Sequence, residues 1–587
     1  MMDADIALPK QTMLSRGLWR VFLQLPLWRH PLSVKIRRSP FFHGILVGLS
    51  LPPLTAWFFF IPLIWGMYHL LRRLESIPQA HWKTACRSGF LFAAGYHLTT
   101  LYWVSLALHV DIAQFWPVFL PALLGLPLGL SLFFMIAIGA LVTLTPPGSR
   151  RLFFPFAWIA SELAQAHLFT GFPWNPVGLA YANTLCGIQI THLIGIHGLS
   201  FLCLIALSCM PPRFSDLFVT KGFTPPVKQV LLQTLVALSL FILPFIWGGI
   251  HLYTHPTVFN PHVRVALIQP NTRQTIKYDP LYSTQIFQTL KTLMIRAQTQ
   301  ISAMDARQPA TASQPATLFV WPESATVYDL INNADARTFA TNTLAPHEYL
   351  MTGLVHRRQT KAQPNKQEAT PAQPHHDSLH NSLGIFNHQG DVLHLYDKTH
   401  LVPFGEYIPL RRRLPFDIEK VTHGAVDFTP GKSLRTLKMS EINPKLPNIA
   451  PLVCYEVIFS GDVIDPQNRP DLFVNVTNDG WYLNSSGPYQ HLAHSRLRAI
   501  EEGIPLVRVA STGISAVFDA LGREVKDITT QQNYIPYGIS GIHITALPKP
   551  QPPLGISRMV LFGILMFLYA LYLCIIIGWR RNPLKKQ

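Results

Sequence analysis

The chain has 587 residues, of which 49% are hydrophobic and only 13% are charged. A soluble protein usually carries about 25% charged residues, so this composition indicates a membrane protein and argues against a wholly soluble one. The formal net charge of +17 is compatible with nucleic-acid binding, so the placement of the charges along the chain decides between these classes. The six cysteines show neither CxxC nor metal-ligand spacing, and the sequence therefore indicates neither a disulfide framework nor a metal site.

The N-terminal half of the chain is dominated by apolar runs. Residues 1–40 are basic, with seven Lys and Arg residues against two acidic ones. Residues 41–71 then contain no Lys, Arg, Asp or Glu, and Pro52-Pro53 interrupt them, which favours two short spans that turn at the prolines. We predict a membrane domain of seven spans at 41–253 and a last span at 557–579, or about eight spans in all. The further apolar runs lie near 88–108, 114–146, 152–169, 187–211, 229–252 and 558–579.

Basic residues separate the two sides of this predicted topology. The short loops around 109–113 and 170–186 hold no Lys or Arg. Every segment on the other side holds Lys or Arg residues: seven in the N-terminus, four in 72–87, two in 147–151, three in 212–228 and four in the basic tail 580–587. The positive-inside rule then places both termini in the cytoplasm and residues 254–556 on the opposite side of the membrane. In a bacterial cell this side is the periplasm, and the spans would lie in the inner membrane. Topology accounts for the basic charge, so no nucleic-acid partner is expected.

The predicted periplasmic segment, 254–556, is long enough to bury a full core. Its strand patterns alternate in part with helical patterns at 281–304 and 488–502, which predicts an α/β domain with a mixed sheet. Two stretches rich in Pro, Gln, Ala and Thr, 305–315 and 358–378, are predicted to be surface insertions. The predicted strands are 263–270, 316–321, 349–355, 383–387, 393–396, 450–454, 472–476, 505–510 and 514–518.

Three stretches of this domain carry candidate catalytic residues, each next to a predicted strand. They present Glu323 in Trp321-Pro322-Glu323-Ser324, Lys398 in Tyr396-Asp397-Lys398-Thr399-His400, and Cys454 in Val453-Cys454-Tyr455-Glu456. Taken singly, each residue has an equally good structural explanation: Glu323 as a solvated carboxylate in a turn, Lys398 as a surface lysine and Cys454 as an inert core thiol. Together they can supply a base, a cation for an oxyanion and a nucleophile, without His or metal.

The ordered set of these three stretches closely resembles the nitrilase superfamily. Asn478-Asp479-Gly480-Trp481 and Gly487-Pro488-Tyr489-Gln490-His491 extend the match. Spans on both sides of the domain, together with Leu101-Tyr102-Trp103-Val104 and Thr170-Gly171-Phe172-Pro173-Trp174, are similar to the apolipoprotein N-acyltransferase family within it. The resemblance implies a multi-pass α-helical membrane domain joined to an αββα sandwich.

The resemblance also implies roles for individual residues. Glu323 is the expected general base, Lys398 stabilises the oxyanion and Cys454 is the nucleophile. Glu406 matches a second carboxylate that orients the site, and Tyr455 and Glu456 match residues beside the nucleophile that the family requires. The candidate substrate-binding residues are Tyr278, Gly171 and Trp174; for Trp174, lipid contact and interfacial anchoring are equally good interpretations. Two positions depart from the family pattern: Tyr278 stands where the family often has Trp, and Gln165 where it often has Arg.

The implied reaction has two steps and needs no cofactor. Cys454 takes an acyl chain from a membrane phospholipid as a thioester, and the N-terminal amine of a diacylated apolipoprotein then takes the acyl chain as an amide. Both substrates are anchored in the bilayer, and a domain tethered by spans is held at the height of the membrane surface. Two alternatives stay open: a membrane-tethered amidohydrolase that uses water as the acceptor, and a transporter or scaffold whose domain only binds.

Overall fold

The computed structural model describes residues 39–53, 60–211, 227–307, 314–358, 378–409, 411, 420–422 and 426–581. Nearly all of the predicted basic N-terminal segment, most of the 358–378 insertion, the middle of the 305–315 insertion and most of the C-terminal tail lie outside the described residues.

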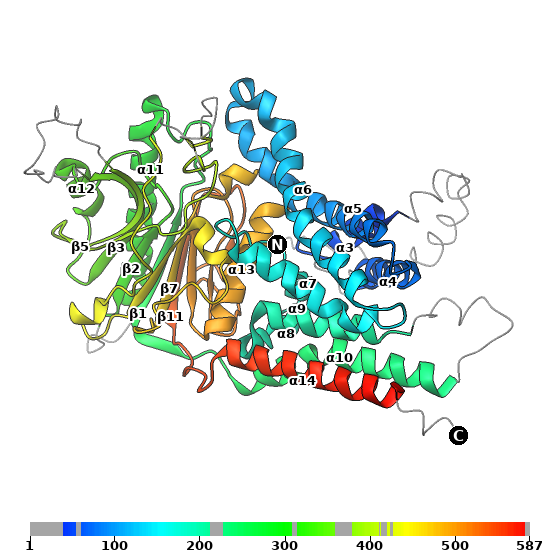
Figure 1. The fold of residues 1–587 in the computed structure, drawn as a ribbon. Coiled ribbons are helices and arrows are strands. Elements are labelled where there is room, and N and C mark those ends of the chain that lie inside the picture. The colour runs from blue at the N-terminus through cyan, green and yellow to red at the C-terminus, as the bar shows by residue number, and fades with distance from the viewer. Residues whose placement is uncertain are drawn as a thin grey trace, which may run out of the picture.

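Two β-sheets packed face to face form the centre of the predicted periplasmic segment (Figure 1). One sheet has six strands in the order β11-β1-β2-β3-β4-β5, and the other has five in the order β10-β9-β8-β7-β6. Both sheets mix parallel and antiparallel pairs, as the sequence predicts. The strands are β1 Phe259–Gln269, β2 Ala316–Trp321, β3 Glu348–Arg358, β4 Ser378–Phe386, β5 Val392–Asp397, β6 Ile449–Val453, β7 Leu472–Thr477, β8 Leu506–Ala510, β9 Ser515–Phe518, β10 Tyr534–Ile535 and β11 Gly541–Pro548.

Alternating side chains build the layers on either side of each sheet. In β2, Leu318 and Val320 pack into the core between the sheets, whereas Phe319 and Trp321 pack against helices on the outer face. Helices α11 Pro280–Asp305 and α12 Ala334–Thr341 cover that face, and α13 Ser486–Glu502 packs on the outer face of the five-stranded sheet. The domain is therefore an αββα sandwich, as expected. The sequence interpretation missed α12, β10 and β11, and β11 completes the six-stranded sheet by pairing antiparallel with β1.

The rest of the described chain is helical. A helix lies at each of the eight predicted spans, and α3 ends before Pro52-Pro53. Among the described residues, four helical stretches are long and apolar enough to cross a membrane, namely Trp82–Leu144, Thr191–Cys209, Val230–Thr254 and Arg558–Ile575; the number of eight spans stays a prediction. The helices are α3 Pro40–Gly48, α4 Phe60–Ser76, α5 Trp82–Leu101, α6 Ile112–Leu144, α7 Arg150–His167, α8 Leu185–Ile188, α9 Thr191–Cys209, α10 Val227–Thr254 and α14 Arg558–Arg581; 3₁₀ helices span Tyr102–Asp111 and Val177–Asn183.

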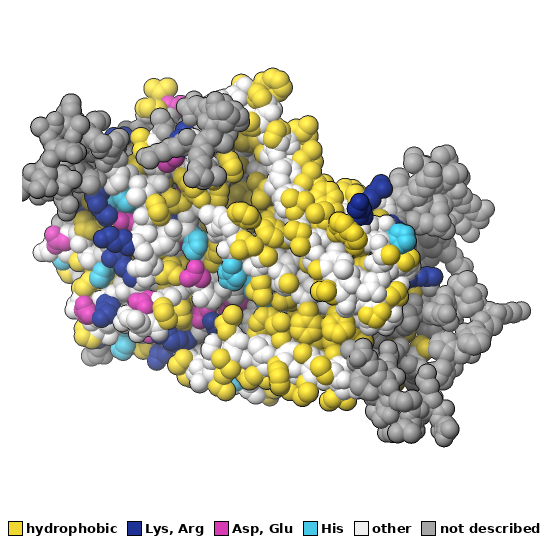
Figure 2. Space-filling model, viewed as in Figure 1, with side chains coloured by type: hydrophobic (Ala, Val, Ile, Leu, Met, Phe, Trp, Pro, Cys, Tyr) yellow, Lys and Arg dark blue, Asp and Glu magenta, His cyan; other side chains and the backbone are white. Residues whose placement is uncertain are grey.

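The surface of this helical part differs from that of the sandwich. Figure 2 shows hydrophobic side chains over α6, α10 and α14, whereas the charged side chains gather over the sandwich. Exposed residues on these helices include Trp116, Ile136, Ile246 and Phe567, which are between 57% and 69% exposed. Large apolar side chains that face outward from several neighbouring helices are typical of a surface solvated by lipid.

Helix α13 joins the two parts. Its Leu497 and Ile500 pack into the core of the helical part with residues of α9, while Ala499 packs with the five-stranded sheet. Near its end, the Glu501 carboxylate accepts a hydrogen bond from the N–H of Ile196 in α9 and pairs with Arg498. The sandwich is thus held against the helices by a buried interface that is both apolar and charged.

Candidate active site

Glu323 lies on a tight turn that follows β2. The next residue, Ser324, has a φ of +43°, and the N–H of Gly353 in β3 donates to the carbonyl of Pro322 at 3.1 Å. Gly353 is required there, because a Cβ at that position would lie 2.5 Å from the Cα of Glu323. The glycine therefore lets β3 approach the turn closely and hold it.

A buried network connects this glutamate to the predicted lysine. Lys398 Nζ lies 2.8 Å from Glu406 Oε2 and 4.0 Å from Glu323 Oε1. The Asn381 side chain donates to Glu323 Oε1 at 2.8 Å and to Glu406 Oε1 at 2.9 Å. The other carboxylate oxygen of Glu323 is buried and has no hydrogen-bond partner among the described residues. An oxygen that is held in place but left unpaired is suited to accept a proton from a reacting group.

Cys454 lies at the junction of β6 and the 3₁₀ helix Cys454–Ile458, with a φ of +55° and 5% of its surface exposed. A residue other than glycine is strained in this left-handed conformation, because its β-carbon crowds the backbone. Such strain persists only where the surrounding structure holds the backbone in place. Here the Cys454 carbonyl accepts hydrogen bonds from Asn475 Nδ2 at 3.3 Å and from His491 at 3.1 Å. Asp479 contacts the other nitrogen of His491 at 2.9 Å and also pairs with Arg508 at 2.6 Å.

The electrostatics of the three predicted catalytic groups are coupled. Burial, reinforced by the negative charge of Glu323, raises the pKa of Cys454 to about 12. Burial also raises the pKa of Glu323, against the attraction of Lys398. Burial lowers the pKa of Lys398, but the carboxylates of Glu406 and Glu323 outweigh it and raise that pKa above its usual value. At neutral pH the thiol is thus protonated, and a thiolate requires a local base and a charged lysine.

Glu456 and Tyr455 tie the turn at Cys454 to its surroundings. One oxygen of Glu456 accepts hydrogen bonds from Tyr396, Thr399 and the N–H of His400, and the other accepts from the N–H of Val453. Glu456 thereby joins the loop after Lys398 to the residue before Cys454. The Tyr455 hydroxyl donates to the Gly171 carbonyl at 2.8 Å, across the boundary between the sandwich and the helices.

The candidate substrate-binding residues lie in three different settings. Gly171 has a φ of +80° and contributes its carbonyl to the contact with Tyr455. Trp174 is only 1% exposed, so in this structure it is part of the interface and faces neither lipid nor solvent. Its indole N–H and that of Trp103 both donate to Gln490 of α13, at 2.8 and 3.2 Å. Tyr278 is half-buried beside Lys277, with the lysine Nζ 5.9 Å from its ring centre.

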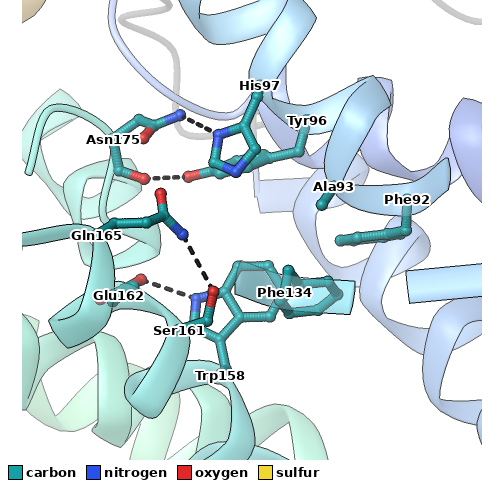
Figure 3. Close-up of a pocket in the computed structure, with 10 residues that line it drawn as sticks. All are labelled: Phe92, Ala93, Tyr96, His97, Phe134, Trp158, Ser161, Glu162, Gln165 and Asn175. Atoms are coloured by element: carbon teal, nitrogen blue, oxygen red, sulfur yellow. Dashed lines mark hydrogen bonds between the residues drawn. The ribbon is translucent and has the colours of Figure 1, made fainter. Parts of the chain in front are cut away.

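A small cavity lies among α5, α6 and α7, next to the segment that carries Gly171 and Trp174. Figure 3 shows the rings of Phe92, Phe134 and Trp158 at one end of this cavity and His97, Asn175 and Tyr96 at the other, where the Tyr96 hydroxyl donates to the Asn175 carbonyl. Gln165 stands where the family often has Arg. Its side-chain amide donates to the Ser161 hydroxyl at 3.1 Å, and its backbone carbonyl accepts from the N–H of Phe172. The cavity lining therefore supports the loop that contacts Tyr455.

Sequence reasoning missed the residues that hold the three predicted groups in place. Asn381, Asn475 and His491 each bond directly to Glu323, Glu406 or Cys454, and Lys277 donates to the Glu323 carbonyl at 2.9 Å. His491 lies in the motif 487–491, but the sequence around it does not indicate which residue it bonds to. In the part of the chain that the structure describes, no group of three or more His, Cys, Asp or Glu residues is placed to hold a metal ion.

Comparison with known proteins agrees with this architecture. Residues 43–209 match the family described as the apolipoprotein N-acyltransferase N-terminal domain, and residues 264–543 match carbon-nitrogen hydrolase. A mutant amidase from Nesterenkonia sp. AN1 is similar over 50% of this chain and 94% of its own, at 17% identity and a TM-score of 0.30.

Three curated relatives, all named apolipoprotein N-acyltransferase, span most of the chain. The one from Rhodopseudomonas palustris is 33% identical over 88% of this chain and 90% of its own. The one from Bradyrhizobium diazoefficiens is 35% identical over 83% of each chain. The one from Rickettsia prowazekii is 33% identical over 84% of this chain and 89% of its own. The chain belongs to the apolipoprotein N-acyltransferase family and is an acyltransferase.

Proposed function

We propose that this enzyme acylates the N-terminal S-diacylglyceryl-cysteine of apolipoproteins, with a membrane phospholipid as the acyl donor. In the first step, Glu323 takes the proton of the Cys454 thiol, and the thiolate attacks the ester carbonyl of the phospholipid. Lys398 stabilises the negative oxygen that forms. When the C–O bond breaks, Glu323 returns the proton to the leaving alkoxide, which gives a lysophospholipid and a thioester on Cys454.

In the second step, the amine of the diacylated apolipoprotein attacks the thioester. Glu323 takes a proton from the amine, the C–S bond breaks, and the thiolate of Cys454 recovers that proton while an amide is released. The observation that carries this proposal is the buried, unpaired oxygen of Glu323 in the same network as Lys398. The contact between Tyr455 and Gly171 supports a site next to the helices, where lipid-anchored substrates are within reach and water is scarce.

We also propose the membrane arrangement that the charges indicate. Residues 41–253 and 557–579 form about eight spans in a bacterial inner membrane. Residues 254–556 form a periplasmic catalytic domain, and the segments 1–40 and 580–587 are cytoplasmic. Outward-facing apolar side chains on α6, α10 and α14 are consistent with such spans.

The mass of the intact protein tests the first step. After incubation of the purified protein with phospholipid in detergent, we expect one added acyl group in the wild type and none in Cys454→Ala. Cys574→Ala, which removes an exposed thiol of α14, is the matched control and should keep the adduct. A wild type without adduct, or an adduct on Cys454→Ala, contradicts the mechanism. Addition of a diacylated lipopeptide should move the acyl group to its amine; release to water alone would favour the amidohydrolase alternative.

A further inference from the structure

A second lysine lies inside the site. Lys277 belongs to the segment between β1 and α11, is 3% exposed, and donates from Nζ to the Glu323 carbonyl at 2.9 Å. This is its only hydrogen bond to a described residue, and no carboxylate in the described chain lies within ion-pair distance of it. A buried ammonium group without a carboxylate partner is costly, which suggests that its charge has a use at this place.

The charges around Cys454 show what that use is. Glu323 and Glu406 are both buried, and Lys398 lies between them, so these three groups by themselves carry a net charge of −1 when ionised. Behind the nucleophile, Asp479 is already compensated by Arg508, and Glu456 adds a further buried carboxylate that is held by N–H and O–H donors. A surplus of negative charge opposes the formation of a thiolate in a buried site.

We propose that Lys277 is a positioning residue that holds the Glu323 turn by its carbonyl and supplies the second positive charge needed for the Cys454 thiolate. This inference deepens the proposed function and rests on it. With Lys277 charged, the set of Glu323, Glu406, Lys398 and Lys277 is neutral. Counted together with the Cys454 thiol, these groups remain neutral when the proton moves from the thiol to Glu323, because the proton is transferred between two members of the set.

The same charge gives the reaction a pH signature. Burial, opposed by the negative charge of Glu323, lowers the pKa of Lys277 to about 8. The positive charge is therefore present below about pH 8 and lost above it. The other groups that face this lysine do not titrate there: the pKa of the Cys454 thiol is about 12, and those of Lys398 and Tyr278 are raised. Burial raises the pKa of Glu323, which places its titration on the acid side.

The test measures the rate at which the phospholipid-dependent acyl adduct forms on Cys454, from about pH 5.5 to about pH 9.5. The amine substrate is left out of this assay, so its titration cannot affect the rate. The wild-type rate should fall above about pH 8. Lys277→Met should lower the rate about tenfold or more at neutral pH, because a rise of one unit in the pKa of the Cys454 thiol lowers its thiolate fraction tenfold. The same variant should show no fall in rate above pH 8. Lys277→Arg keeps the charge at every pH tested and should restore most of the rate without the alkaline fall.

Lys291→Met is the matched control. Lys291 is also buried, bonds to the Ala340 carbonyl and to Asn342, and has a pKa lowered to about 8 by burial, but it lies on α11 away from Cys454. An equal loss of rate in this variant, or wild-type behaviour of Lys277→Met, overturns the inference. If the wild type forms no adduct, the proposed function fails. The inference is then decided by the pH dependence of Cys454 alkylation by iodoacetamide in the same variants, where an unchanged profile in Lys277→Met overturns it.

Discussion

Replacing Gly353 by alanine displaces Glu323 without changing any predicted catalytic side chain. The added Cβ would lie 2.5 Å from the Cα of Glu323 and 2.7 Å from the carbonyl oxygen of Pro322, whereas ordinary contacts begin near 3.4 Å. Both are backbone atoms, so no side chain can rotate away. The turn must therefore move by about 0.9 Å, the difference between 3.4 and 2.5 Å, or β3 must move by as much.

A displacement of this size should slow acyl transfer more than it destabilises the fold. Misplacement of a reacting group by about 1 Å can cost on the order of 100-fold in rate, and overpacking costs about 1–3 kcal/mol of stability. We expect a drop of that order in the rate of adduct formation on Cys454 in Gly353→Ala, measured at a temperature where the variant is still folded according to its thermal unfolding curve.

Gly384→Ala is the matched control for overpacking in the same sheet. A Cβ on Gly384 would meet side-chain atoms of Leu354 and Phe386, at 2.8 and 2.9 Å, and these can move. This variant should lose stability and keep the rate of its folded fraction. A wild-type rate in folded Gly353→Ala would refute the claim that the backbone position of Glu323 governs the chemistry.

Two further predictions concern the interface and the topology. Gln490→Leu removes the acceptor shared by Trp103 and Trp174 and the donor to the Pro52 carbonyl. At about 1–3 kcal/mol for each buried group left unpaired, this variant should have a clearly lower melting temperature than the wild type. Equal melting temperatures for Gln490→Leu and the wild type would contradict this role. A reporter enzyme that works only in the periplasm should be active when it is fused at residue 365. A reporter that works only in the cytoplasm should be active when it is fused to the C-terminus. A cytoplasmic signal at residue 365 would overturn the topology inferred from the basic residues.

Local sequence determined the elements that carry the candidate site. The predicted strand 316–321 is β2 residue for residue, and the other predicted strands and both predicted helices of the sandwich lie where expected. Side-chain periodicity is a property of neighbouring residues, so it can be read along the chain. For the same reason, the motifs around Glu323, Lys398 and Cys454 can be recognised in the sequence alone.

The tertiary structure alone decided which groups meet. Asn381 lies 58 residues from Glu323, and Lys277 lies 46 residues from it, yet both bond to it directly. Trp174, open to two interpretations from sequence, is buried because α13 brings Gln490 to it from 316 residues away. β11 was missed although β1 needed an edge partner. Such contacts depend on how layers pack and strands pair, and no local pattern encodes the partner of a buried polar group.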